Sequence, residues 1–273
     1  MGERLAGSQK VTGSSPVTST TSPSSSQSSA VAPRPPSRFW EIDALRGLAV
    51  LAMIVFHFAW DWAYVNDGRL GDGSRYASGL IAGTFITVLG VSIALDRDRV
   101  RAAGASQWRR TAHRFLLIGG AAAIVTLATR LFLPDEFIYF GILHLLAACT
   151  VLVALTARLG PLVNALLGLA LLIVGWSPLL EGPGPGWLWS AAGWSAPVAT
   201  VDWYPLAPWA GFAFLGFAAG RTFYAGGRRR FALRDRSAQT APLRFVGRHA
   251  LAIYLGHQLL LLPLAWLLAE VLT

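Results

Sequence analysis

The sequence predicts an all-α fold, a polytopic bundle of about seven transmembrane helices. Of its 273 residues, 54% are hydrophobic and only 14% are charged, whereas about a quarter of the residues of a soluble domain are charged. Several apolar stretches exceed the ~18–20 residues that a helix needs to cross a bilayer. Together these observations exclude a soluble enzyme and predict an integral membrane protein.

The apolar stretches predict seven spans. Their approximate bounds are residues 43–65, 77–95, 113–133, 137–157, 161–180, 204–224 and 244–271. The last stretch is longer than one crossing requires and contains Pro263, which favours either a kinked helix or a helix joined to an interfacial segment. GxxxG patterns at 79–83 and 216–220 are typical of helices that pack closely.

The net charge of +9 is explained by topology. Fifteen arginines lie in or beside the loops between spans two and three, four and five, and six and seven, while the opposite loops hold only Arg69, Arg75 and Arg130. The positive-inside rule assigns the basic loops, and with them the N-terminus, to the cytoplasm. Since topology accounts for the positive charge, no nucleic-acid partner is expected.

Residues 1–37 differ from the rest of the chain because Ser, Thr and Pro dominate them. Such a segment is predicted to be disordered, and it lacks the apolar core of a signal peptide. An over-extended gene start, with translation beginning nearer Arg38, is the alternative interpretation. Residues 38–273 are predicted to form the transmembrane domain. Its single cysteine, Cys149, is predicted to be a small buried helix residue.

A polar stripe runs along the first span, which contains MIVFHFAWDWAYV at 53–65. With Arg46 at zero on a helical wheel, His57 falls at ~20°, Asp43 and Asp61 at ~60° and Tyr64 at ~0°. Ionisable side chains are costly in hydrocarbon, so this shared face is expected to line a water-filled cavity or a polar core.

Asp61 lies one turn beyond His57, and we expect it to hydrogen-bond the imidazole. Such a partner would orient a histidine that acts as a general base. A purely structural His–Asp pair that ties helices together is the alternative.

Two other spans carry polar side chains at comparable depth. His144 lies in the fourth span, and Tyr254, His257 and Gln258 share one side of the last span. Three membrane histidines favour a shared polar centre, although each could also be a satisfied core residue. The spacing does not match a zinc motif, so no metal is expected.

The outer loop from Glu181 to Asp202 is rich in Gly, Pro and Trp. Its tryptophans, together with the adjoining Trp203, either form an interfacial aromatic belt or offer a stacking platform for a sugar ring. Trp203 is the substrate-binding candidate on the second interpretation.

Four segments carry a resemblance to a known family. They are RFWEIDALRGLAVLAMIVFHFAWDWAYV (38–65), GTFITVLGVSIAL (83–95), FIYFGILHLLAA (137–148) and FVGRHALAIYLGHQLLL (245–261). In this order they resemble the bacterial heparan-α-glucosaminide N-acetyltransferase-like membrane family, within the membrane acyltransferases. The eukaryotic lysosomal enzyme has a proposed active histidine in the outer loop after its first helix. The corresponding stretch here, NDGRLGDGSRYA (66–77), contains no histidine, which leaves His57 as the substitute.

The resemblance implies a multi-pass acyltransferase of the bacterial inner membrane. Its donor would be cytosolic acyl-CoA, with acetyl-CoA expected, and its acceptor an amino-sugar or hydroxyl group of an extracytoplasmic glycan. The sequence leaves the oligomeric state open. A transporter or flippase that uses the stripe as a substrate or proton path is the main alternative, and a scaffold of a cell-envelope complex is a third.

Roles for the candidate residues follow from this resemblance and from the stripe. His57 with Asp61 would deprotonate the acceptor, or His57 would itself be acylated first. His144 or His257 would help stabilise the thioester oxyanion. The expected substrate contacts are Asp43, Arg46, Tyr64, Tyr254, Gln258 and Trp203, with the arginines at 97–114 neutralising the phosphates of coenzyme A.

Overall fold

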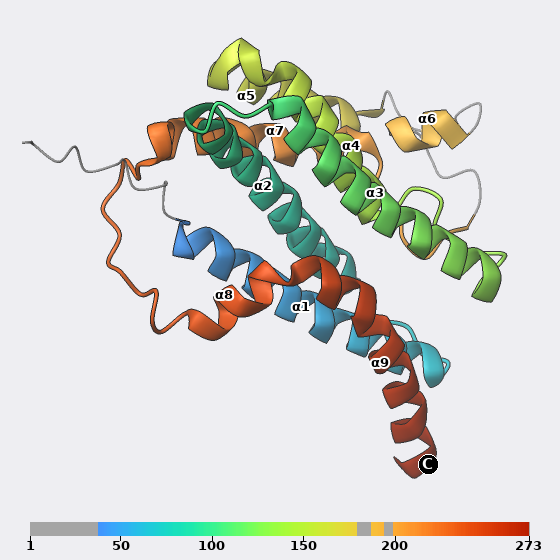
Figure 1. Cartoon of the computed structure of the whole chain (residues 1–273). Coiled ribbons are helices and arrows are strands. Elements are labelled where there is room, and N and C mark those ends of the chain that lie inside the picture. Colours follow the sequence, from blue (N-terminus) through green and yellow to red (C-terminus); the bar gives the residue numbers. More distant parts are fainter. Residues whose placement is uncertain (1–37, 179–186, 194–198, 273) are drawn as a thin grey trace, which may run out of the picture. The chain divides into compact units, whose positions relative to one another are not determined.

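The predicted all-α membrane fold is confirmed by a computed structural model, which describes residues 38–178, 187–193 and 199–272, without the side chains of 187–189 (Figure 1). The segment 1–37 and Trp194 lie outside the described residues. Where the chain is described, it forms helices and no extended strand. These are α1 (Trp40–Val65), α2 (Gly73–Ala102), α3 (Gln107–Phe132), α4 (Ile142–Thr156), η1 (Ala157–Leu159), α5 (Gly160–Gly175), α6 (Trp187–Ala192), α7 (Leu206–Phe223), η3 (Ala225–Gly227), α8 (Ala241–Arg248) and α9 (Ala250–Leu272).

Five helical stretches in the described part are long and apolar enough to cross a membrane. They are α1, α2, α3, α9 and the stretch Ile142–Gly175, which joins α4 and α5 through η1. The predicted sixth span corresponds to the 18-residue helix α7. A count of seven spans and a cytoplasmic N-terminus stay predictions.

The long apolar stretch at the end of the chain is divided between two helices. Its first part is α8, which ends at Arg248, and α9 begins at Ala250. Pro263 lies inside α9 and does not end it. The stretch therefore consists of a short helix followed by a longer one that contains Pro263, and a kink at this proline or an interfacial location of one segment stays a prediction.

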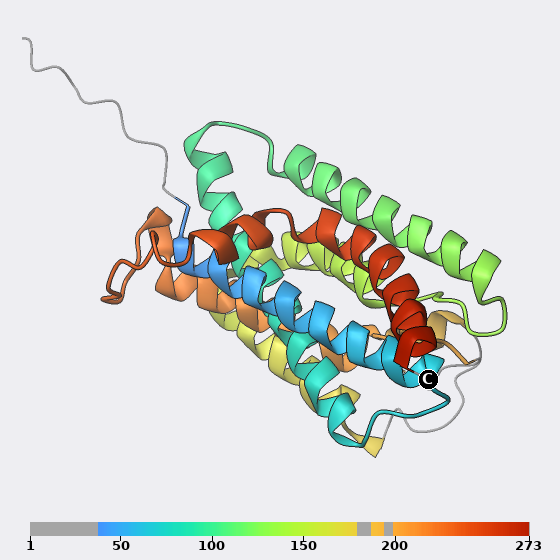
Figure 2. The same cartoon turned by 90° about the horizontal axis from the view of Figure 1, so that it is seen from below.

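Glycines allow α8 to cross α1 at backbone contact. A Cβ on Gly47 would overlap the carbonyl oxygen of Leu243, and one on Gly247 would overlap that of Asp43. From this crossing α9 continues alongside α1 (Figure 2). The two ends of the described chain are thus packed together, which brings the polar face of α1 next to the last span.

The apolar core lies between α2, α4 and α7. Ile86, Leu145 and Phe217 are fully buried there, and so is Cys149, as predicted. The GxxxG pattern of α7 serves this packing, because a Cβ on Gly216 would overlap the backbone of Thr87 on α2. On α3 and α5 the exposed side chains are mostly apolar, as expected for surfaces that face lipid.

Ion pairs gather the basic loops at the end of the bundle where α1 begins. Glu41 accepts two hydrogen bonds from Arg229, at 2.8 Å from Nε and 2.7 Å from Nη2, and a third from the Tyr224 hydroxyl at 3.1 Å. Arg221 pairs with Asp98 near the end of α2. The α7–α8 connection therefore meets the start of α1, and the end of α7 is tied to the end of α2.

Candidate active site

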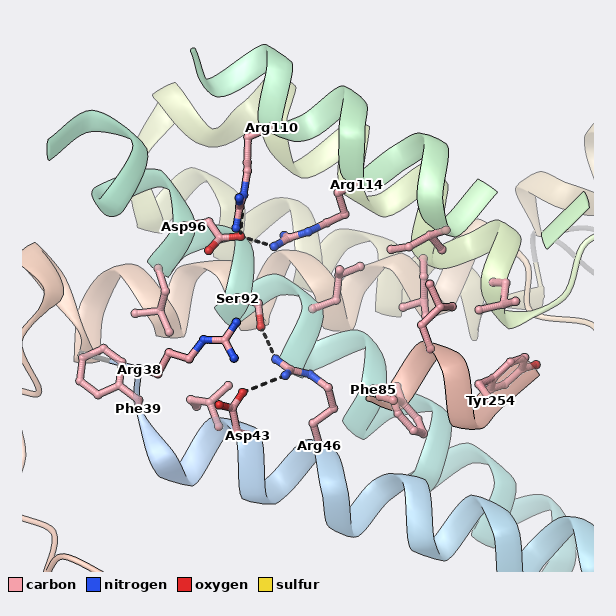
Figure 3. Close-up of a pocket in the computed structure, with 18 of the residues that line it drawn as sticks. Arg38, Phe39, Asp43, Arg46, Phe85, Ser92, Asp96, Arg110, Arg114 and Tyr254 are labelled. Atoms are coloured by element: carbon pink, nitrogen blue, oxygen red, sulfur yellow. Dashed lines mark hydrogen bonds and ion pairs between the residues drawn. The ribbon is translucent and has the colours of Figure 1, made fainter. Parts of the chain in front are cut away.

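Arg46 joins three helices at the basic end of the bundle. Its guanidinium donates to the Asp43 carboxylate at 3.0 Å, to the Ser92 hydroxyl of α2 at 2.8 Å and to the Gly247 carbonyl of α8 at 3.4 Å. Figure 3 shows this group between α1 and α2. The predicted polar stripe therefore begins with two residues that are fixed across helices and face inward.

Asp96 holds several further guanidinium groups beside this one. The carboxylate is buried near the end of α2 and forms ion pairs with Arg114, with Arg110 at 3.8 Å and with Arg99 at 3.5 Å. One negative charge thus orients three arginines while leaving an excess of positive charge, and Figure 3 shows two of them, Arg110 and Arg114, pointing towards Asp96. Sequence reasoning missed Asp96. The available signal was an acidic residue at the end of an apolar helix, directly before an arginine-rich loop.

A cavity of about 300 Å³ extends from these arginines into the bundle. Five arginines and two aspartates line it at one end, and its remaining wall is mainly apolar, with Phe85, Leu89, Ile142, Leu143, Leu146 and Leu251. Tyr254 of α9 lies at the other end, and its hydroxyl points away from the arginines (Figure 3). The cavity is thus cationic at one end and apolar along its length.

His57 and His257 meet next to Tyr254. Their ring centroids lie 4.7 Å apart, and the His257 and Tyr254 centroids are separated by 5.4 Å. Each Nδ1 faces a backbone carbonyl, that of Met53 at 2.9 Å for His57 and that of Tyr254 at 2.5 Å for His257. Since a carbonyl oxygen only accepts, each Nδ1 carries the proton, and each neutral ring keeps a lone pair on Nε2. The pair therefore offers two potential proton acceptors.

Asp61 uses a different partner from the one expected. The Gln258 amide nitrogen donates to its Oδ1 at 2.5 Å, while the Nδ1 of His57 is already bonded to Met53. The expected Asp61–His57 hydrogen bond is corrected accordingly, because the carbonyl one turn back on the same helix captures the imidazole N–H. Asp61 is fully buried, and within the described residues Asp61 Oδ2, Gln258 Oε1 and His257 Nε2 have no hydrogen-bond partner.

His144 is not joined to the histidine pair by any contact that the described residues show. Its Nδ1 accepts from the Gly141 N–H at 3.3 Å, and its Nε2 faces the Thr126 hydroxyl at 3.2 Å. Both ring nitrogens are therefore engaged at the start of α4, where the side chain acts as a helix cap.

Two other candidates lie apart from the cavity. Tyr64 is 52% exposed and stacks on Trp60 at 5.4 Å between ring centroids, so the stripe leaves the interior before the end of α1. Trp203 pairs through its backbone with Phe140, and its buried Nε1 has no partner among the described residues.

Asp202 is a second carboxylate that sequence reasoning missed. Its Oδ2 accepts the Ile142 N–H at 2.9 Å at the start of α4. Burial raises the pKa of this carboxyl to about 6, although the Ile142 N–H favours the charged form. The available signal was an acidic residue between two aromatic-rich segments at a helix boundary. Many acidic residues that only cap helices occur in the same pattern, so the signal is not specific.

Comparison with known proteins identifies the family. The family model described as "Heparan-alpha-glucosaminide N-acetyltransferase, catalytic" matches residues 38–259, which is most of the chain. The match includes the four segments that carry the resemblance, except for the last two residues of the fourth segment. Among curated proteins and solved structures, no match is found. The predicted family resemblance is thus confirmed, and the chain belongs to the heparan-alpha-glucosaminide N-acetyltransferase catalytic family, a family of membrane acetyltransferases.

Proposed function

We propose that the protein transfers an acetyl group from cytosolic acetyl-CoA to an amino-sugar or hydroxyl acceptor at the opposite face of a bacterial inner membrane. The observation that carries this proposal is the cavity, which begins among arginines at the basic end of the bundle and ends at Tyr254, whose ring contacts His257 of the histidine pair. With the basic end in the cytoplasm, the donor enters from the side where acetyl-CoA is made.

The charge distribution of the cavity matches the shape of the donor. Coenzyme A carries its phosphates at one end and its thioester at the end of a long, largely uncharged arm. Five arginines against two aspartates leave net positive charge at the mouth, and guanidinium groups bind phosphate through charge-assisted, often bidentate hydrogen bonds. The apolar walls would then hold the arm and direct the thioester towards Tyr254.

The histidine pair supplies the base that acyl transfer requires. As the acceptor nitrogen or oxygen attacks the thioester carbonyl, its proton passes to the Nε2 of His57. The C–S bond then breaks, and the departing thiolate takes up that proton. The same lone pair would serve as a nucleophile in a two-step transfer through an acylated His57. The Tyr254 hydroxyl is suited to donate to the carbonyl oxygen as negative charge develops there.

Asp61 and Gln258 support this centre rather than act on the substrate. Their hydrogen bond joins α1 to α9 one turn beyond His57, which fixes the distance between the helices that carry the two histidines. We assign His144 to the cap of α4, since both of its nitrogens are occupied there.

Coenzyme A release by the purified protein tests the proposal. Acetyl-CoA is supplied with glucosamine, and His57→Gln is compared with His249→Gln. The control is matched because His249 also bonds the carbonyl four residues back, at 2.9 Å, yet lies exposed at the end of α8. Acceptor-dependent release that is lost only in His57→Gln supports the transferase. Release with neither acceptor class, amine or hydroxyl, would contradict it and favour transport.

A further inference from the structure

The loop that carries Asp202 is fixed to the segment preceding α4. Val201 N–H donates to the Glu136 carbonyl at 3.1 Å, and Tyr204 N–H donates to the Phe140 carbonyl at 3.1 Å. The carboxylate between them occupies the space where a side chain at position 141 would lie, because a Cβ on Gly141 would overlap its Oδ2. The position of the carboxylate is therefore set by the backbone hydrogen bonds on either side of it and by Gly141, which leaves room for it.

This carboxylate does not line the cavity but adjoins its wall through the backbone of Ile142. Its Oδ2 contacts the backbone of Ile142, and Ile142 and Leu143 form part of the cavity wall. It also interacts electrostatically with the hydroxyl of Tyr254, which closes that end of the cavity. Asp202 thus adjoins the place where a donor thioester would end.

No cation neutralises Asp202 within the described residues. No Arg, Lys or His there lies within ion-pair distance, and the titratable groups around it are the phenols of Tyr204 and Tyr254 and the neutral, capping imidazole of His144. The residue is half-buried, so part of its surface is accessible. A negative charge that is held in place and left unpaired suits a ligand that brings its own positive charge.

We propose that Asp202 binds the ammonium group of the acceptor and takes its first proton. The inference rests on the proposed transferase and specifies its acceptor as a primary amine. An ammonium cannot attack a thioester, so one N–H bond must break before the reaction, and its proton passes to the Asp202 carboxylate. The neutral amine then forms the C–N bond as the C–S bond breaks. A second proton leaves nitrogen through His57 for the thiolate. The overall products are the acetamide, free thiol and one proton, which Asp202 releases to water.

The pH dependence with two acceptors tests this assignment. Asp202→Asn keeps an oxygen for the Ile142 N–H but cannot take a proton. With glucosamine, kcat/KM of this variant near pH 7 is expected to fall by about 10²-fold or more. It should recover as the pH rises and the amine loses its proton in solution. With hydroxylamine, which is already neutral at pH 7, the loss should shrink to a few-fold.

A purely structural cap would reduce turnover of both acceptors equally at every pH, and that result would overturn the assignment. So would unchanged turnover of glucosamine. The exposed Asp235→Asn is the matched control, and acetyl-CoA binding verifies that Asp202→Asn is folded. If the wild-type protein releases no coenzyme A with either amine, this inference fails, and the proposed function fails with it only if a hydroxyl acceptor also gives no release.

Discussion

His57 of α1 and His257 of α9 meet edge to face, with 4.7 Å between their ring centroids, and the Nδ1 of each is bonded to a backbone carbonyl of its own helix. The two helices come from opposite ends of the described chain, so the pair exists only in the folded bundle. Because both rings present a bare Nε2, their protonation is expected to be coupled, and the predictions begin with this pair.

Replacement of either histidine should impair transfer without unfolding the protein. His57→Gln is expected to lower kcat/KM by about 10²–10⁴-fold, the range for loss of a general base, and His257→Gln by a smaller factor. If the rings act as a unit, the double variant will be no slower than His57→Gln alone. Additive losses in steady-state kinetics would show that the two histidines act separately.

Loss of Arg114 should weaken donor binding and leave the chemistry intact. A hydrogen bond to a charged group contributes about 1.5–3 kcal/mol, so Arg114→Gln is expected to raise KM for acetyl-CoA by about tenfold or more with little change in kcat. Asp96 keeps Arg99 and Arg110 as partners in this variant.

Arg101→Gln is the control, because Arg101 is exposed near the end of α2 and does not line the cavity. Acetyl-CoA should raise Tm of the wild-type protein and of this control, and raise it much less for Arg114→Gln. Equal shifts in all three proteins would place the donor elsewhere.

The crossing of α1 and α8 should not tolerate a methyl group. Gly247→Ala places a Cβ on the backbone of Asp43, and overpacking of this kind costs about 1–3 kcal/mol. Gly256→Ala in α9 is the matched control, since its Cβ would meet nothing within 4 Å and helix propensity favours alanine by about 0.5–1 kcal/mol. Unfolding in mixed micelles measures both, and a Gly247→Ala protein as stable as Gly256→Ala would contradict the crossing.

The Glu41–Arg229 ion pair should stabilise the basic end of the bundle. Both side chains are largely buried, with exposed fractions of 13% and 22%. Glu41→Gln removes a charge partner from Arg229 and an acceptor from Tyr224, so the free energy of unfolding should fall by about 1–3 kcal/mol. Glu270→Gln, an exposed carboxyl near the end of α9, should have no such effect. A loss of equal size in both variants would show that the pair contributes nothing specific.

Features that repeat with the period of an α-helix could be predicted from the sequence alone. The stripe on the first span predicted Asp43, Arg46, His57 and Asp61 as inward residues. Asp43 and Asp61 are buried, Arg46 bonds across helices, and His57 is half-buried against His257 of α9. Tyr64 lies on the same side of the helical wheel but is exposed. A helical wheel gives the direction of a side chain, but it does not show how far along the helix the neighbouring helices extend.

Partners across the chain could not be predicted in the same way. A one-turn spacing suggested Asp61 for His57, whereas a backbone carbonyl and Gln258 compete for these groups at shorter range. Asp96 and Asp202 gain their significance from arginines and backbone groups that other helices bring to them. Neither the periodicity nor the residue spacing within one segment shows which groups of other helices will contact it.

The hydrogen bond between Asp61 and Gln258 has a consequence for biogenesis, since its partners are separated by 197 positions. At ~5–20 residues per second, a ribosome needs roughly 10–40 s to make the intervening chain. Throughout that interval the first helix carries a buried-to-be carboxyl group whose later partner is not yet synthesised. Retention of α1 beside the insertion machinery until α9 emerges would spare this carboxyl an unpaired exposure to lipid, which early release would impose.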